Sequence, residues 1–173
     1  LGDVYKRQVF LRGNSVLEIT TGTWNGLGTR LSADSTGTLK LSGNVTGTTT
    51  DALSKVTYEI GSGTRLTLSA GTYGNTITGA GSLWSASGTT VLKGKVDIGG
   101  EYRLIGVKNT ASSWTLDSNA SLTAGSFIGR YEFNGTTTLN INAGAVMNIT
   151  GTLQAARDGK SIMNIAQDAM VLA

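Results

Sequence analysis

Five short units of one kind repeat between Trp114 and Gly151, and this repeat restricts the possible folds more than any other feature. Each unit is two apolar residues around one polar residue, followed closely by Gly, Asn, Ser or Asp. Successive units begin eight or nine residues apart, which is too short for a strand plus a crossover helix and suits short strands joined by tight corners. The units are Trp114-x-Leu116, Leu122-x-Ala124, Tyr131-x-Phe133, Leu139-x-Ile141 and Met147-x-Ile149.

The same alternation continues more loosely on both sides of this block. No segment carries a sustained helical stripe of apolar residues; Ser161 to Leu172 comes nearest, but Gly159 and the strands before it argue against a helix. We expect residues 21–28 to form a loop, residues 46–55 to form a longer corner, and the chain to be all-β.

Composition supports a folded chain. The 173 residues include 25 Gly but no Pro, Cys or His, and 39% are hydrophobic. Only 14% are charged, whereas a disordered chain is polar and highly charged. The missing Pro agrees with hydrogen-bonded ladders in which every N–H donor is needed.

These strands could form a sandwich, a barrel or a solenoid. Asn25-Gly26, Asn134-Gly135 and Asp158-Gly159 are hairpin turn signals, and an antiparallel sandwich therefore stays open as an alternative. The even spacing favours a right-handed, single-stranded parallel β-helix. Three units would make a coil of about 25 residues, giving about six or seven coils and roughly 30 Å of rod.

In a β-helix the two apolar residues of each unit face the core and the polar residue faces solvent. We expect Ala70 and Ala124 to fit the narrow interior, and Gly to occupy the corners. The residues predicted to point inward include Leu116, Leu122, Phe133, Ile141 and Ile149. The residues predicted to point outward include Lys40, Glu59, Thr67, Asp97, Thr115, Glu132, Asn140 and Asn148.

The first residues of the sequence have an unusual feature. Residues 1–8 look like the in-frame translation of a transposase sequencing adapter, and we leave them out of the fold. Residues 9–173 are then predicted to be a β-solenoid fragment of a longer chain.

Residues 37–50, GTLKLSGNVTGTTT, resemble the strand repeat of bacterial autotransporter passenger domains, and residues 135–146 match its second half. After Thr50 the chain departs from the repeat, because Asp51-Ala52 replaces an apolar residue and a Gly. The good matches cover about a fifth of the chain, and the Gly, Thr and Asn texture extends over nearly all of it.

The resemblance implies a function and a location. A passenger is exported through the periplasm and the outer membrane and displayed at, or released from, the surface of a Gram-negative bacterium. Its partners would be a host-cell or matrix glycan or protein and its own C-terminal outer-membrane barrel, which is absent from this sequence. We expect a monomeric rod that acts as an adhesin stalk or binding module without a catalytic site.

Charge and residue types narrow the possible chemistry. The formal net charge is only +3 and the basic residues are dispersed, so we expect no nucleic-acid surface. Without His or Cys the sequence offers no Ser-His-Asp triad, Cys-His dyad or His/Cys zinc site. No phosphate-binding glycine motif precedes a helix. We therefore expect no cofactor and no metal.

Carboxylates remain as candidate catalytic groups. Asp97, Glu101 and Asp117 could share one outer face, with Lys95 and Arg103 nearby. Paired carboxylates perform glycoside hydrolysis, so the alternative hypothesis is a polysaccharide-degrading β-helix enzyme, that is, a glycoside hydrolase, a lyase or a phage tailspike. The competing interpretation is that these side chains only keep the rod soluble.

Aromatic and amide side chains give two further hypotheses. Trp24, Trp84 and Trp114 could stack on sugars if exposed, although the position of Trp114 in its unit predicts a core residue. Asn140, Asn142 and Asn148 could form stacked amide ladders with a structural role.

Overall fold

The computed structural model describes residues 7–25, 29–32, 34–49, 55–106, 110–131 and 135–173. Throughout this part of the chain the regular structure is β-strand, and every strand pairing is parallel. No described helix is long and apolar enough to cross a membrane. The prediction of an all-β parallel fold is confirmed, and the antiparallel sandwich is excluded for these residues.

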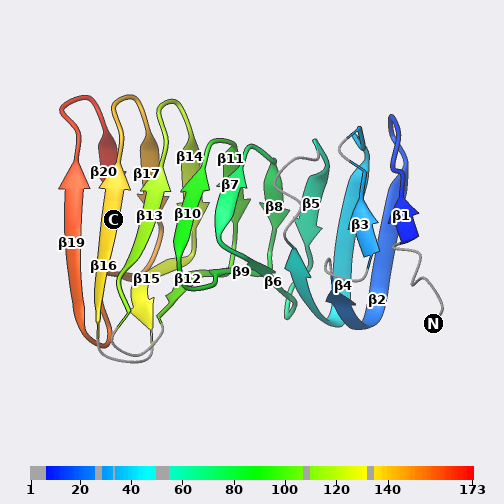
Figure 1. Ribbon diagram of the computed structural model, residues 1–173, viewed down its shortest axis with the longest axis horizontal. Helices are drawn as coiled ribbons and strands as arrows, with labels where there is room; N and C mark the ends of the chain where they lie inside the picture. The colour runs from blue at the N-terminus through cyan, green and yellow to red at the C-terminus, as the bar shows by residue number, and fades with distance from the viewer. Residues whose placement is uncertain (1–6, 26–28, 33, 50–54, 107–109, 132–134) are drawn as a thin grey trace, which may run out of the picture.

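The strands stack into columns that run along a rod (Figure 1). Column A, in stacking order, consists of the first half of β2 (Val16–Asn25), the first half of β4 (Thr38–Thr49), β5 (Thr57–Ile60), β8 (Ile77–Gly79), β11 (Lys95–Ile98), β14 (Ser121–Ala124), β17 (Val146–Ile149) and β20 (Met170–Leu172).

Column B follows column A around each coil. It consists of the second halves of β2 and β4, then β6 (Arg65–Leu68), β9 (Ser82–Ser85), β12 (Glu101–Ile105), β15 (Ser126–Tyr131) and β18 (Leu153–Gln154). Because β2 and β4 each run through both columns, their hydrogen bonds join A and B into one large sheet.

Column C closes the coil. It consists of β7 (Gly71–Tyr73), β10 (Thr89–Leu92), β13 (Ser112–Leu116), β16 (Thr136–Ile141) and β19 (Lys160–Ile165). Near the N-terminus, β1 (Arg7–Val9) pairs with β3 (Thr29–Leu31) in a separate two-stranded sheet. Of residues 1–8, which the sequence suggested to be an adapter, residues 1–6 lie outside the described chain.

The coil is right-handed, as predicted. In Figure 1 the chain rises along β10, β13, β16 and β19 in front, passes behind at the top, and advances from the N-terminal end at the right to the C-terminal end at the left. Among the described strands, column A contains seven successive pairings, in agreement with the expected six or seven coils. The coils are shorter in the middle, where Tyr58 pairs with Ile77 and Ile77 with Val96, than at the end, where Leu122 pairs with Met147.

Strand alternation places apolar side chains inside the rod. Leu116, Leu122, Ile141 and Ile149 are buried, as predicted, and so is Ala124. The predicted outward residues that the structure describes are partly or fully exposed, whereas Glu132 and Phe133 lie outside the described residues. Burial of this continuous apolar interior, at about 25 cal/mol per Å², stabilises the stack of coils.

The centre of the core is an aromatic cluster from three neighbouring strands of columns B and C. Tyr102 stacks on Phe127 and meets Trp114 edge-on, with ring centroids 5.6 Å apart in both pairs. The Tyr102 hydroxyl accepts a hydrogen bond from Trp114 Nε1 (2.9 Å) and shares another with Ser85 Oγ (2.6 Å). A fully buried Tyr needs such partners. The core position predicted for Trp114 is confirmed.

Three local predictions were wrong. Residues 21–25 and 46–49 are strand rather than loop and corner, because β2 and β4 continue into column B with β-branched Thr side chains in a paired ladder. Residues 26–28 and 50–54 lie outside the described chain. Ala70 is exposed rather than interior, because it stands between β6 and β7 instead of inside a strand.

Candidate functional site

The three carboxylates suggested by the sequence stand at three different columns. Asp97 lies in β11 of column A, Glu101 begins β12 of column B, and Asp117 follows β13 of column C. Each has a basic neighbour: Lys95 Nζ is 3.6 Å from Asp97, Lys93 Nζ is 3.4 Å from Asp117, and Arg103 pairs with Glu101. The contacts of Asp97 and Asp117 are ion pairs on a solvated surface, whereas Arg103 and Glu101 are largely covered.

The surroundings of Asp117 favour its ionised form. Asn142 Nδ2 donates a hydrogen bond to its carboxylate (2.9 Å), and the Ser118 amide and Lys93 add to this effect, so the pKa of Asp117 lies below its ordinary value. A general acid for glycoside hydrolysis needs the opposite, a raised pKa. Asp117 therefore lacks the property that this role requires.

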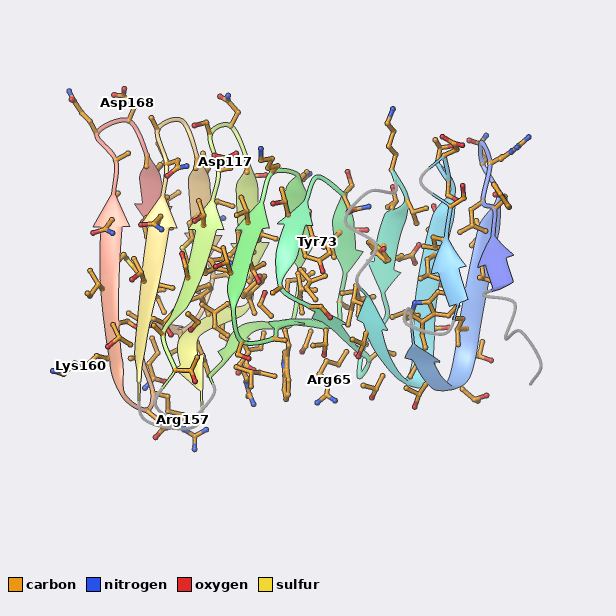
Figure 2. All side chains as sticks on the ribbon, viewed as in Figure 1. Arg65, Tyr73, Asp117, Arg157, Lys160 and Asp168 are labelled. Atoms are coloured by element: carbon orange, nitrogen blue, oxygen red, sulfur yellow. The ribbon has the colours of Figure 1, made fainter. Side chains whose placement is uncertain are left out.

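A different set of side chains lines a surface groove on column B. The groove has a volume of about 400 Å³, within the range of small-ligand sites. Its lining includes Trp84 from β9, Arg65 from β6, and Glu101 and Arg103 from β12. Figure 2 shows Arg65 at the lower edge of the rod and Asp117 at the upper edge, so the groove and the Asp117 corner are separate.

Strand register builds the aromatic and cationic part of this groove. Trp84 is paired directly with Arg103 in the next coil, and its other neighbour in register is Thr67, two residues after Arg65. The Arg65 guanidinium carbon lies 4.1 Å from the Trp84 ring centroid, and that of Arg103 lies 4.5 Å away. Both distances are within cation–π range. We call these three residues the Arg–Trp–Arg ladder.

The floor of the groove is a glycine-rich corner, where Gly63 and Gly81 lie beside Thr64 and Ala80. The corners between columns A and B carry Gly61, Gly81, Gly100, Gly125 and Gly151 in successive coils. Gly100 N donates to Gly81 O (3.1 Å), and Gly125 N donates to Gly100 O (2.9 Å). A Cβ on Gly81 or Gly100 would collide with the carbonyl oxygen of the glycine below it. The close stacking of these corners therefore requires glycine.

The charges of the groove do not cancel. Glu101 pairs with Arg103, while Arg65 contacts Trp84 and has no acidic partner among the residues that the structure describes. The described lining therefore has two guanidinium groups against one carboxylate. Ser82 lies between Arg65 and Glu101 in register, and its hydroxyl oxygen accepts a hydrogen bond from the Glu101 amide (3.4 Å). This arrangement favours an anionic ligand.

A second hollow beside Gly135, Thr136, Gly159 and Lys160 has a volume of about 330 Å³, and its described lining has neither an aromatic nor an acidic side chain. A space of about 10 Å³ inside the rod beside Thr90 and Trp114 has room for about one water molecule and not for an organic ligand. Within the described residues, no group of three or more Asp or Glu side chains could hold a metal ion. On column C, Asn164 Nδ2 donates to Asn140 Oδ1 (2.9 Å), and Asn140 Nδ2 donates to Thr115 Oγ1 (3.4 Å). These are the structural ladders that the sequence suggested for Asn140.

Sequence reasoning named Trp84 and Arg103 but not their association, and it missed Arg65. A signal was present, because residues 65, 84 and 103 are evenly spaced at the 19-residue period that separates Tyr58, Ile77 and Val96 in column A. The two other tryptophans, Trp24 and Trp114, are both buried. Trp84 is thus the described tryptophan that reaches the surface.

Comparison of the chain with protein-family models, with curated proteins and with solved structures finds no match. The resemblance to autotransporter passengers therefore rests on the strand repeat in the sequence.

Proposed function

We propose that this chain is a segment of a surface-displayed passenger of the autotransporter type, and that it works as an adhesive rod. The segment would be exported through the periplasm and outer membrane and would contact a glycan or protein of a host cell or matrix. Two observations support this: residues 38–49 of the resembling repeat form β4, which passes through two columns of a parallel β-helix, and the rod carries a groove suited to binding.

The observation that carries the proposal is the contrast between the groove and the rest of the rod. On column A, Lys40 Nζ lies 3.5 Å from Glu18 and 3.8 Å from Glu59 in the coils on either side. Asp97 and Asp117 are also paired, as described above. Much of the charged surface is thus self-neutralised, while Arg65 is not. A groove that holds a cation without an acidic partner is suited to recognition.

A polysaccharide-degrading enzyme is the second candidate, favoured by the tryptophan and the carboxylate in the groove. Glycoside hydrolysis needs two carboxyl groups about 5–10 Å apart across the scissile bond. Glu101 is the one carboxylate among the described lining residues, and it is held by Arg103. The groove therefore supports binding better than hydrolysis.

The experiment compares binding with turnover. The purified chain is fixed to beads, and the beads are applied to cultured cell layers and to matrix-coated surfaces; in parallel, the chain is incubated with a panel of polysaccharides and new reducing ends are measured. We expect bead retention without new reducing ends. Beads that carry the Trp84→Ala variant test whether the groove is the adhesive site, and they should be retained less than beads with the wild-type chain.

Two results would count against the proposal. Release of new reducing ends by the wild-type chain would indicate the enzyme. Equal retention of the wild-type and Trp84→Ala beads would show that the groove is not the adhesive site.

A further inference from the structure

The two faces of the Trp84 ring are already occupied. Arg65 comes from the coil before Trp84 and Arg103 from the coil after it, and both guanidinium groups lie within 5 Å of the ring centroid. A sugar that binds tryptophan through its apolar face needs a free ring face. The ladder therefore presents guanidinium donors to a ligand instead of an aromatic platform.

Stacking also holds the two guanidinium groups in place. A mobile arginine side chain at the surface loses conformational entropy when it binds an anion. Contact with a rigid ring reduces that loss, and the planar fork of guanidinium matches a carboxylate or a sulfate. Glu101 already engages Arg103. Arg65 is the cation that an incoming anion would meet first.

The rest of the groove suits hydroxyl groups. The Ser82 oxygen accepts from the Glu101 amide and can still donate its own proton. The Glu101 carboxylate can accept from ligand hydroxyls. At Gly63 a Cβ would meet nothing within 4 Å, so a sugar ring could approach the backbone of this corner closely. A ligand with one anionic group and several hydroxyls would use all of these features.

We infer that the groove binds an acidic polysaccharide, and this inference rests on the proposed adhesive function. A carboxylate or sulfate of the polysaccharide is held by Arg65, and hydroxyls of the same or the next sugar contact Ser82 and Glu101. The ligand runs over the Arg–Trp–Arg ladder on column B and uses the glycine corner as its floor.

The test measures binding of the purified chain by titration calorimetry against four probes. Polygalacturonate carries carboxylates, dextran sulfate carries sulfates, dextran is neutral, and polyglutamate is an anion without sugar rings. We expect binding to one or both acidic polysaccharides, at least tenfold weaker binding to polyglutamate, and none to dextran. The preference between the first two identifies the anionic group.

Variants locate the site. Arg65→Gln removes the proposed anion contact and should weaken binding about tenfold or more, since a hydrogen bond to a charged group is lost. Lys95→Gln makes the same charge change on column A, away from the groove lining, and should leave affinity within about twofold. Glu101→Gln releases Arg103 and should strengthen binding several-fold, which a purely structural role for Glu101 would not do.

Several results would overturn the inference. They are equal losses in Arg65→Gln and Lys95→Gln, weaker binding by Glu101→Gln, or polyglutamate binding as tight as that of the polysaccharides. If none of the acidic probes binds while beads of the wild-type chain are still retained on cells, the acidic-polysaccharide inference fails and the adhesive function stands. If neither occurs, both fail.

Discussion

Replacing Tyr102 by Phe removes one buried hydroxyl and keeps the ring. The ring would still stack on Phe127 and Trp114. The change leaves Trp114 Nε1 and Ser85 Oγ without the partner that each has in the wild type. Because the Tyr102 side chain is fully buried and Trp114 is 1% exposed, bulk water cannot replace it directly.

Each buried polar group left without a partner costs about 1–3 kcal/mol. Two such groups predict a loss of roughly 2–6 kcal/mol in the free energy of unfolding. Ser85→Ala leaves the Trp114 bond in place and should cost about 1 kcal/mol. In the double variant, Ser85 is no longer present as an unpaired hydroxyl. The double loss should therefore be smaller than the sum of the single losses by about 1 kcal/mol.

The pH dependence adds a second readout. Burial raises the pKa of Tyr102 to about 12, against the lowering effect of its hydrogen bonds from Ser85 and Trp114. A raised folded-state pKa means that the stabilisation is complete below the unfolded-state pKa of about 10 and is lost as pH rises toward 12. The stability difference between wild type and Tyr102→Phe should shrink above pH 10, by up to about 1.4 kcal/mol per pH unit.

The assay is urea unfolding, followed by far-UV circular dichroism and by tryptophan fluorescence, for the wild type, the two single variants and the double variant. Coincidence of the two signals tests whether unfolding is two-state. The reasoning is refuted if Tyr102→Phe costs less than about 0.5 kcal/mol, a loss typical of an ordinary surface change.

The remaining predictions concern a corner and a carboxylate. Gly100→Ala should destabilise the chain by about 2 kcal/mol or more, because the new Cβ would collide with backbone. At Gly74 a new Cβ would meet nothing within 4 Å, so the control variant Gly74→Ala should change stability by less than about 0.5 kcal/mol. Equal losses of the two variants in thermal unfolding would contradict the stacked-corner description. The lowered pKa of Asp117, due first to the Asn142 hydrogen bond, implies stability that is present above the unfolded-state pKa and lost as pH falls through the folded-state value. Acid unfolding should therefore lose part of its pH dependence below about pH 4 in Asp117→Asn, and an unchanged acid profile would show that this pairing contributes nothing.

The regular part of the fold could be predicted from sequence because the alternation within each unit and the spacing between units both indicate stacked strands there. Within each unit the alternation of apolar and polar residues identifies a strand and its inward face. Between units, the constant spacing shows that each strand stacks on one about a coil earlier. Leu122 and Met147, which begin units three apart along the chain, are paired in register.

The first coils were harder to predict because their strands are not apolar. Residues 21–25 and 46–49 consist largely of Thr and Gly, a composition that also suits loops. They become strand because parallel neighbours supply the hydrogen bonds: residues 21–25 pair with β4, and residues 46–49 pair with β2 and β6. This pairing is a tertiary effect absent from local sequence. The prediction of an interior position for Ala70 was wrong because a small apolar residue fits either the interior of the rod or a corner.

The groove could not be predicted from single residues. Its formation depends on register between coils, and register in residues 71–95 could not be fixed from the sequence, because Gly and Ser interrupt the alternation there. A shift of one residue would have turned Trp84 into the core. The contact of Trp84 with both Arg65 and Arg103 follows only when the pairing of β6, β9 and β12 is known.

The central claim is that successive coils stack in register along one axis. On column A, one outward row runs through Glu18, Lys40, Glu59, Thr78, Asp97, Thr123 and Asn148, each paired with the next. The chain has no native cysteine. Spin labels can therefore be attached at chosen pairs of this row through introduced cysteines.

Pulsed electron–electron double resonance measures the stacking directly. One spin label is attached through Asn148→Cys, and the other through a cysteine introduced at position 18, 40, 59 or 78. With about 4.8 Å per coil, the account predicts label separations near ~29, ~24, ~19 and ~14 Å, falling by one coil spacing at each step. Separations that do not fall in this order, or two that coincide, would contradict the parallel β-helix.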